Sequence, residues 1–205
     1  SWLWPFATLG WPNNTKDLKS FYPTNDLVTG PDIIFFWVAR MIMGGLYFQK
    51  EIPFSNVYFT GIIRDDQGRK MSKSLGNSPD PLDLIDKYGA DALRVGLLLI
   101  APQGSDILYS EDKILHGRNF MNKLWNSARF ILMNTNNFDE KLPDEKDLHI
   151  TDRWIISKLH ATIANVEKSY EQYKLNEVIK TIYEFVYDCF CDWYIEFVKT
   201  RFYGD

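Results

Sequence analysis

The arrangement that most constrains the fold is a strand, a helix and a second strand within about forty residues. Residues 27–28 are a short apolar segment, residues 32–47 have the length and apolar content of a helix, and residues 56–63 are rich in β-prone side chains. Pro31 and Asp32, which follow a Thr29-Gly30 turn, suit the start of a helix. Parallel strands need a long crossover that is usually helical, so this order predicts a βαβ unit with a buried first strand.

The rest of the chain is predicted to be helical. Residues 81–88 and 90–99 form two helices separated by Gly89, and beyond Ser110 only helical patterns follow. Thr151 or Asp152 is expected to cap a helix, and residues 134–147 are expected to form a polar linker. Apolar residues three and four apart predict three inward-facing stripes. The stripes are Ile114, Gly117, Met121, Leu124, Trp125, Ala128, Ile131 and Leu132; Ile155, Leu159, Ile163, Val166 and Tyr170; and Val178, Ile182, Phe185, Cys189, Trp193 and Phe197.

These patterns define a fold class. We expect an α/β part, a partial Rossmann-like nucleotide-binding half-domain over residues 1–110, followed by an all-α helical bundle over residues 111–205. Residues 1–22 are rich in Trp and Pro and lack a regular period, so we expect a loop whose aromatic side chains need a partner surface. Such a beginning favours a fragment of a longer protein.

Composition and charge exclude several classes of protein. The 45% of apolar residues argue against disorder, and 23 basic against 27 acidic residues disfavour tight, nonspecific nucleic-acid binding. The apolar runs at residues 33–38 and 95–101 are too short to span a membrane, and nothing resembles a signal peptide. We therefore expect a cytoplasmic monomer without membrane association. Cys189 and Cys191 point to different faces of a helix, so we expect reduced thiols and no metal site.

The most informative motif is Lys70-Met71-Ser72-Lys73-Ser74, which lies between Gly68 and Gly76. Two lysines three residues apart on a glycine-bracketed loop suit a polyphosphate whose negative charge shifts during a reaction. The preceding turn, residues 65–68, comes directly off a strand, and ligands of open α/β sheets bind at the carboxyl ends of strands. A solvated surface turn is the alternative interpretation of the same residues.

Other residues could complete a nucleotide site. Gly61, near the end of a β-rich segment, would allow a flat ligand such as adenine to approach the backbone, although a bend at the strand end also explains it. Asp32, beside Gly30 in the first turn of a helix, could accept hydrogen bonds from a ribose, or it could only cap the helix.

Six segments of the sequence together match one known family: residues 28–42, Lys70 to Asn77, Pro81-Leu82, Lys87 to Arg94, Gly117 to Phe120 and Asn122 to Phe130. On these segments the chain resembles the valyl-tRNA synthetase family of the class I aminoacyl-tRNA synthetases. The resemblance is nearly continuous to about residue 135 and looser beyond it, where it indicates a helical anticodon-binding domain.

The resemblance implies a ligase that activates valine with ATP and transfers it to tRNA(Val), with magnesium held chiefly by the phosphates. Lys73 would be the principal lysine that contacts ATP, together with Ser72, and Lys70 a second cation on the departing pyrophosphate. Ile33 and Trp37, four residues apart in a helix, would line the valine pocket, although both could be ordinary core.

Two departures and two absences qualify this resemblance. Pro31 replaces the usual aromatic residue, and Thr60 stands where many members have histidine. The His-x-Gly-His-type turn and the editing insertion are missing from the sequence, so we expect the chain by itself to be inactive.

A tRNA-facing surface is also expected. Arg118, Asn122 and Arg129 lie outside the first stripe and could face a phosphate backbone, although a merely solvated helix face explains them as well. The alternatives to a valine enzyme are an isoleucyl- or leucyl-type synthetase and a noncatalytic RNA-binding or scaffolding module derived from a synthetase.

Overall fold

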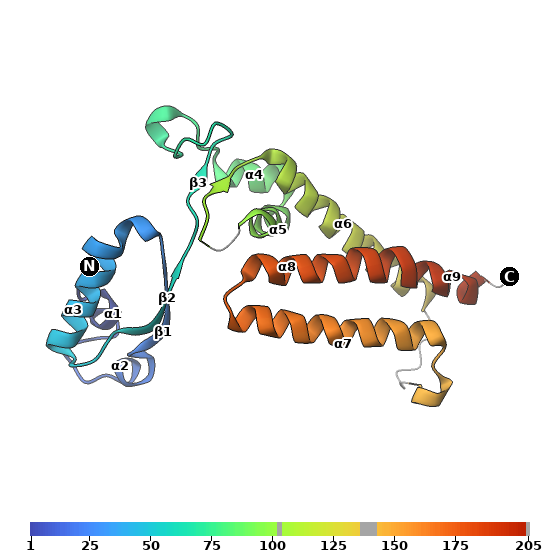
Figure 1. Cartoon of the computed structure of the whole chain (residues 1–205), viewed down its shortest axis with the longest axis horizontal. Helices are drawn as coiled ribbons and strands as arrows, with labels where there is room; N and C mark the ends of the chain where they lie inside the picture. The colour runs from blue at the N-terminus through green and yellow to red at the C-terminus, as the bar shows by residue number, and fades with distance from the viewer. Residues whose placement is uncertain (102–103, 136–142, 204–205) are drawn as a thin grey trace. The chain divides into compact units, whose positions relative to one another are not determined.

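The structure, a computed structural model, describes residues 1–101, 104–135 and 143–203 (Figure 1). It contains two compact units, one formed mainly by Ser1–Ile62 and the other by the chain from Ile63 onward. This division lies within the predicted first domain, and the predicted change of domain near residue 110 stays a prediction.

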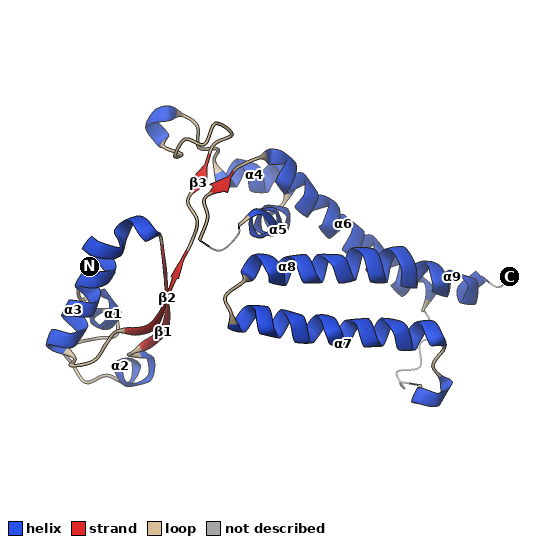
Figure 2. Cartoon of the chain, in the orientation of Figure 1, coloured by secondary structure: helices blue, strands red, loops and turns tan. Residues whose placement is uncertain are grey.

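The first unit contains the predicted βαβ arrangement. Strands β1 (Thr24–Thr29) and β2 (Phe54–Phe59) pair in parallel, with Thr24 opposite Phe54 and Thr29 opposite Phe59 (Figure 2). The crossover consists of a 3₁₀ turn η1 (Pro31–Ile33), π-helical turns η2 (Ile34–Val38) and helix α3 (Ala39–Phe48). Val38, Met41 and Phe54 form the buried core between the crossover and the strands.

The prediction of a buried first strand is wrong for Val28, which is 60% exposed. Side chains of a strand alternate between the two faces of a sheet. Leu27 packs against the core that the crossover covers, and the neighbouring Val28 therefore points to the opposite face.

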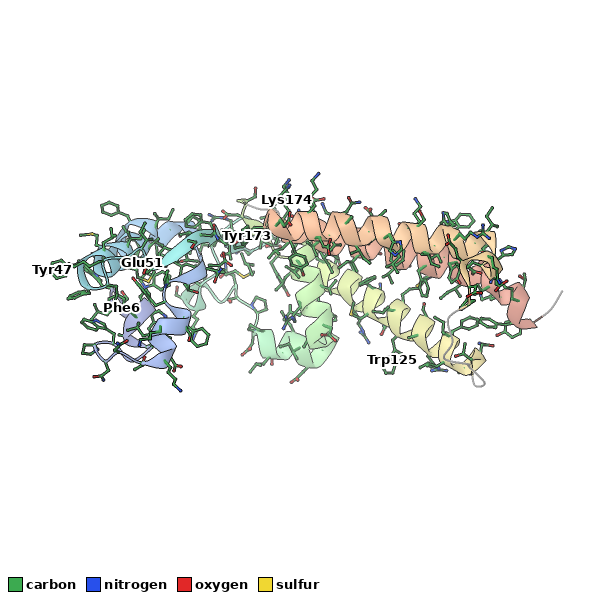
Figure 3. All side chains as sticks on the ribbon, turned by 90° about the horizontal axis from the view of Figure 1, so that it is seen from below. Phe6, Tyr47, Glu51, Trp125, Tyr173 and Lys174 are labelled. Carbon is green, nitrogen blue, oxygen red and sulfur yellow. The ribbon has the colours of Figure 1, made fainter. Side chains whose placement is uncertain are left out.

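The opening segment is not the irregular loop that we expected. It contains helices α1 (Trp4–Ala7) and α2 (Lys16–Phe21), and the side chain of Thr15 caps the second. Phe6 is fully buried, with its ring 5.3 Å from Trp11, 5.9 Å from Tyr22 and 6.2 Å from Phe48 (Figure 3). Phe6 and Trp11 therefore find aromatic partners within the unit, whereas Trp4 and Phe21 remain more than 60% exposed.

One described segment, Pro31–Phe48, is long and apolar enough to cross a membrane by composition, with a mean hydropathy of 1.3 over 18 residues. The apolar run at residues 33–38 lies within this longer segment, so by length and composition the prediction that nothing resembles a membrane span is wrong. A single such segment is weak evidence for a span, because core helices pass the same test. Val38 and Met41 pack against the strands, and 22% of the segment is buried within the structure.

The second unit begins with a two-residue strand β3 (Ile63–Arg64), which pairs in parallel with β4 (Ile107–Leu108). Between them lie the lysine loop and helices α4 (Pro81–Tyr88) and α5 (Ala90–Ile100), separated by Gly89 as predicted. Helix α6 (Glu111–Asn134) then crosses α5 at close range. A Cβ atom at Gly117 would lie 2.3 Å from the Ala92 carbonyl oxygen, so only glycine fits this contact.

The remaining helices form a bundle. Helix α7 (Ile150–Glu171) lies beside a second long helix, built from α8 (Leu175–Glu184), π-helical turns η5 (Phe185–Tyr194) and α9 (Ile195–Tyr203) (Figure 1). Of the predicted linker, residues 136–142 lie outside the described residues, and Glu145–Asp147 form a single turn η4.

The cap of α7 differs from the prediction. His149 is the N-cap residue, and Asp152 is the third helical residue, whose carboxylate accepts a hydrogen bond from the His149 amide at 2.9 Å. Thr151 and Asp152, the predicted cap residues, therefore lie in the first turn of the helix and not at its N-cap.

The predicted inward stripe of α6 is correct only for its first turns. Ile114 and Gly117 are buried, whereas Trp125 is 73% and Leu132 is 70% exposed (Figure 3). Eleven and eighteen residues are close to three and five helical turns, so these two side chains face the same way as Ile114. Further along α6, Phe120 and Ser127 on another side of the helix are buried instead.

The other two stripes are also incomplete. Ile155 and Val178 are buried as predicted, but Leu159, Ile163, Tyr170, Trp193 and Phe197 are each at least 40% exposed. In the last helix the π-helical turns of η5 widen the helix, so a stripe extrapolated at 3.6 residues per turn loses its register there. Among the described residues 185–203, Cys191 within η5 and Ile195 just after it are the buried ones.

An α/β part followed by a helical region, the predicted fold class, is confirmed. Both two-stranded parallel sheets lie within residues 24–108, and the described elements beyond them are helical (Figure 2).

Candidate functional site

The lysine loop, residues 65–77, starts directly at the end of strand β3. The Asp65 amide donates to the Arg69 carbonyl at 2.9 Å, and the Gly68 amide donates to the Asp65 carbonyl at 3.0 Å. Gly68 has a φ of 77°, a conformation that favours glycine. Arg64 and Lys70 pair as an antiparallel bridge, so the chain turns back on the end of the strand.

Lys70 and Lys73 lie beyond this turn, and both residues are exposed. Lys73 begins a 3₁₀ turn η3 (Lys73–Leu75), which ends at Gly76 with a φ of 62°. The Ser72 hydroxyl caps this turn, because it accepts a hydrogen bond from the Leu75 amide at 3.3 Å. Its predicted role in binding ATP stays a prediction.

Asp65 is the most buried residue of the loop, with an exposure of 5%. One carboxylate oxygen accepts hydrogen bonds from the Gln67 amide at 3.1 Å and the Arg69 amide at 2.7 Å. The other accepts from Arg69 Nε at 2.7 Å and Asn77 Nδ2 at 2.9 Å. These bonds, led by that from Asn77, lower the pKa of Asp65 to about 2, so the carboxylate is ionised at neutral pH.

Asn77 lies at the other end of the loop and bonds back into it. Its side-chain oxygen accepts from the Ser72 amide at 2.9 Å, and its amide group reaches the Lys70 carbonyl at 3.4 Å. Asp65 and Asn77 therefore join the two ends of a segment whose middle holds both lysines.

The two arginines near the loop, Arg64 and Arg69, form ion pairs with nearby carboxylates. Arg69 forms an ion pair with Asp65, and Arg64 forms one with Asp106 and also donates to the Gly68 carbonyl at 3.3 Å. Lys70 and Lys73, like Arg69, are exposed on the surface of the loop.

A hollow of about 600 Å³ lies on one side of the loop. Neither Lys70 nor Lys73 lines it, and its rim contains the carboxylates of Asp66, Glu111 and Asp112. Negative side chains repel a polyphosphate. The charged ligand that the lysines suit therefore does not belong in this hollow.

Gly30 and Gly61, in the first unit, lie just past the paired ends of β1 and β2. The parallel pairing ends at Thr29 and Phe59, and the Thr60 amide still donates to the Thr29 carbonyl at 2.9 Å. A Cβ atom at Gly30 would meet nothing within 4 Å, so packing within the structure does not require glycine there. This carboxyl edge of a parallel pair is where α/β proteins bind ligands.

The other predicted residues of the first unit also have definite positions. Asp32 is exposed in the first turn of the crossover, next to Gly30. Ile33 is partly buried, and Trp37 packs against the core of Val38, Met41 and Phe54. Trp37 thus makes the contacts of an ordinary core residue, which was the alternative to a role in the valine pocket. Its contact with an amino-acid side chain stays a prediction.

Arg118, Asn122 and Arg129 are exposed on α6, as expected, but the prediction that they lie on a different side from Trp125 and Leu132 is wrong, because seven residues are close to two helical turns. Trp125 and Leu132 lie on the same side of the helix, where a hollow of about 420 Å³ is lined by Trp125, Ala128, Arg129, Leu132 and Met133. The exposed face is therefore mixed, with cations beside a large aromatic ring.

The two cysteines have no functional arrangement among the described residues. Both are free thiols, and the Cys191 sulfur lies 3.0 Å from the Ser127 hydroxyl between η5 and α6. Within residues 1–101, 104–135 and 143–203, no group of three His, Cys, Asp or Glu side chains could hold a metal ion.

Sequence reasoning missed the roles of Asp65 and Asn77. A signal for Asp65 was present, because aspartate at the first position of a turn that ends in glycine commonly bonds to the following amides. Asn77 gave no such signal, since its partners lie five, seven and twelve residues away.

The comparisons with known proteins agree with this geometry. Residues 1–110 match the family described as tRNA synthetases class I (I, L, M and V), and residues 152–205 match the anticodon-binding domain of tRNA ligase. The chain therefore belongs to the class I tRNA synthetases of this group.

Within that class, the chain is similar to valine–tRNA ligases. It is 56% identical to the enzyme of Fusobacterium nucleatum over 205 residues, which is 99% of this chain and 23% of the relative. It is 52% identical to that of Clostridium tetani over 204 residues, again 99% of this chain and 23% of the relative. The chain thus spans about a quarter of the length of these relatives.

Solved structures share the fold. The LeuRS of Agrobacterium radiobacter K84, in a ternary complex with tRNA and LeuAMS, matches 90% of this chain and 26% of its own with a TM-score of 0.74 and 21% identity. A methionyl-tRNA synthetase of Mycobacterium tuberculosis bound by methionyl-adenylate matches 94% of this chain and 38% of its own, with a TM-score of 0.73 and 24% identity.

Proposed function

We propose that this chain serves as the lysine-loop part of the catalytic domain and the start of the anticodon-binding domain of a valine–tRNA ligase. The single observation that carries this proposal is the lysine loop, in which two exposed lysines stand on a segment joined at both ends by Asp65 and Asn77. The similarity to valine–tRNA ligases supports the choice of amino acid.

The proposed reaction has two steps. The carboxylate of valine attacks the α-phosphate of ATP, a new acyl–phosphate bond forms, and pyrophosphate leaves with the electrons of the broken P–O bond. The valyl group is then transferred to the terminal ribose of tRNA(Val), and AMP leaves. Lys73 and Lys70 stabilise the negative charge that gathers on the departing pyrophosphate, because fixed cations help most where charge develops.

The rest of the nucleotide is assigned to the carboxyl edge of β1 and β2. Gly30 and Gly61 leave the backbone accessible to adenine, and the Asp32 carboxylate accepts hydrogen bonds from ribose hydroxyls. Magnesium suits a site of this kind when ATP brings it, since it keeps phosphate and water ligands and needs few protein carboxylates. Ile33 and Trp37 line the pocket of the valine side chain.

Arg118, Asn122 and Arg129 are assigned to the phosphate backbone of the tRNA. The exposed cations on α6 fit such a contact, and the net charge of −4 means that this contact is local rather than general. We further propose that the ligase works as a cytoplasmic monomer.

Valine-dependent exchange of pyrophosphate into ATP tests the proposal. A full-length ligase that contains this segment is expected to catalyse exchange with valine and more weakly with isoleucine, since one methylene is worth about 1–3 kcal/mol of discrimination. The isolated chain is expected to catalyse none. Exchange that prefers isoleucine or leucine in the full-length ligase, or exchange by the isolated chain, would refute the assignment.

A further inference from the structure

The lysine loop is not held in place by apolar burial. Of residues 65–77, only Asp65 is buried, and Leu75, a large apolar residue of the loop, is 60% exposed. Apolar burial, which dominates the stability of most folded segments, therefore contributes little to the conformation of this loop.

Polar side chains hold the loop instead. Asp65 accepts from the amides of Gln67 and Arg69, and Asn77 accepts from the amide of Ser72 and donates to the carbonyl of Lys70. The bond from Asn77 Nδ2 to the Asp65 carboxylate, at 2.9 Å, then joins these two sets across twelve residues.

These bonds fix the backbone on both sides of Met71. The Lys70 carbonyl and the Ser72 amide are bonded to the same Asn77 side chain, and Ser72 caps the turn that begins with Lys73. The backbone positions of Lys70 and Lys73 are therefore set by Asn77, and Asn77 is set by Asp65. Asp65 and Asn77 are not themselves the cationic groups that suit the phosphates.

We propose that Asp65 and Asn77 are positioning residues, which present Lys70 and Lys73 as a pair to the departing pyrophosphate. This inference rests on the proposed function of the loop. Cations displaced by about an ångström lose much of their benefit, and such misplacement costs up to about a hundredfold in rate.

Charge alone predicts the opposite effect of substitution. Asp65 is an anion in the same loop as the two lysines, so its neutralisation would raise the positive potential of the loop and favour a polyphosphate. Positioning predicts a slower reaction. In Asp65→Asn the new NH₂ group must face another donor, either Asn77 Nδ2 or the backbone amides from which the carboxylate accepts hydrogen bonds, so at least one of these bonds is lost. The sign of the change therefore separates the two explanations.

The first experiment measures the conformation of the loop in this chain, without reference to activity. Hydrogen exchange of peptides within residues 66–76 is compared for the unchanged chain, Asp65→Asn, Asn77→Asp and the control Asp66→Asn. Asp66 is exposed, so the control removes the same charge outside the network. We expect exchange at least tenfold faster for the first two variants and unchanged for the control, with helix content preserved in all of them. Equal exchange in all four proteins would overturn the proposed role.

The second experiment measures adenylate formation in a full-length ligase that contains this segment. Asp65→Asn and Asn77→Asp are expected to slow valyl-adenylate formation roughly tenfold to a hundredfold with little change in valine affinity. Asp66→Asn is expected to keep the original rate. The reciprocal exchange, Asp65→Asn with Asn77→Asp, restores a donor opposite an acceptor and is expected to recover part of the loss in both experiments.

The outcomes separate this inference from the proposed function. An unchanged ligase that fails to activate valine refutes the proposed function itself. An active ligase in which Asp65→Asn and Asn77→Asp leave the rate unchanged, although hydrogen exchange in the loop is faster, refutes only the positioning role. Loss of valine binding in proportion to rate would likewise overturn it, because it would indicate general damage.

Discussion

The lysine loop and the crossing of α5 with α6 lie in the same compact unit but are held by opposite kinds of contact. The crossing depends on Gly117 and Gly96, where an added Cβ would lie 2.3 Å from the Ala92 carbonyl oxygen and 2.8 Å from the Lys113 carbonyl oxygen. Buried apolar side chains, Leu93 and Ile114 among them, surround the crossing. The loop has almost no buried apolar surface and depends on Asp65 and Asn77.

This difference in contacts implies that the α5–α6 crossing is rigid and that the lysine loop can be displaced. Backbone packed against backbone has no low-energy rearrangement, so the crossing provides a fixed base. Side-chain hydrogen bonds can break one at a time and form again, which suits the role proposed here for the two lysines. The same unit thus combines a rigid support with a segment that is ordered but can be displaced.

Gly117→Ala tests the rigid side of this comparison and is expected to have the largest effect on stability. The new methyl group would overlap backbone atoms that cannot turn aside, and overpacking of this kind costs about 1–3 kcal/mol. The free energy of unfolding of the chain, measured in urea, is expected to fall by that amount.

Gly30→Ala is the matched control for this substitution. Its φ of −81° suits any residue, and an added Cβ would meet nothing within 4 Å. We expect its free energy of unfolding to stay within about 0.5 kcal/mol of the unchanged chain, as for other substitutions that create no buried clash. A Gly117→Ala variant as stable as Gly30→Ala would show that α5 and α6 are not closely packed.

The exposed face of α6 gives a second, smaller effect. Arg118→Gln combined with Arg129→Gln is expected to weaken binding of cognate tRNA and to reduce the slope of log affinity against log salt by up to about two, one for each phosphate that an arginine no longer neutralises. Lys16→Gln with Lys19→Gln removes the same charge from exposed positions of α2, outside the segment that matches the anticodon-binding domain, and serves as the control. Identical salt slopes for the two double variants would remove α6 from the tRNA path.

The pH dependence of the loop is expected to be the smallest effect near neutrality. The pKa of Asp65 in the folded chain is lowered to about 2, below the ordinary value of 3.8, so its stabilising contribution is fully present above about pH 4. That contribution is lost as the pH falls toward 2. The NMR signal of the Arg69 amide, bonded to Asp65, is expected to titrate in this acid range and to lose the transition in Asp65→Asn. A midpoint near pH 4 or above would contradict the proposed network.

Local patterns predicted much of this fold because its elements are locally encoded. The βαβ order, the break at Gly89 and the helical second half each follow from residues within about one helix length. The exposure of Trp125 could not be predicted in this way. The apolar stripe of α6 continues past Ile114 and Gly117, and periodicity does not reveal where along α6 the covering helix stops.

The candidate site shows the same limit. The spacing of Lys70 and Lys73 suggested a role that stays a prediction, and the structure shows that both residues are exposed. Asn77 was missed because its importance lies in a bond to Asp65, which depends on how the loop closes. Likewise, η5 was not predicted, since nothing in the apolar spacing of residues 185–194 distinguishes π-helical from α-helical turns.

Pre-steady-state formation of valyl-adenylate by the Lys73→Ala variant of a full-length ligase that contains this segment tests the central claim most directly. Loss of a fixed cation where charge develops is expected to slow this step by about a hundredfold to a thousandfold, or roughly 3–4 kcal/mol, while valine binds with nearly its original affinity. The matched variant Lys158→Ala is expected to form the adenylate at the original rate. An unchanged rate with Lys73→Ala would contradict the account and leave the lysine loop as a solvated surface turn.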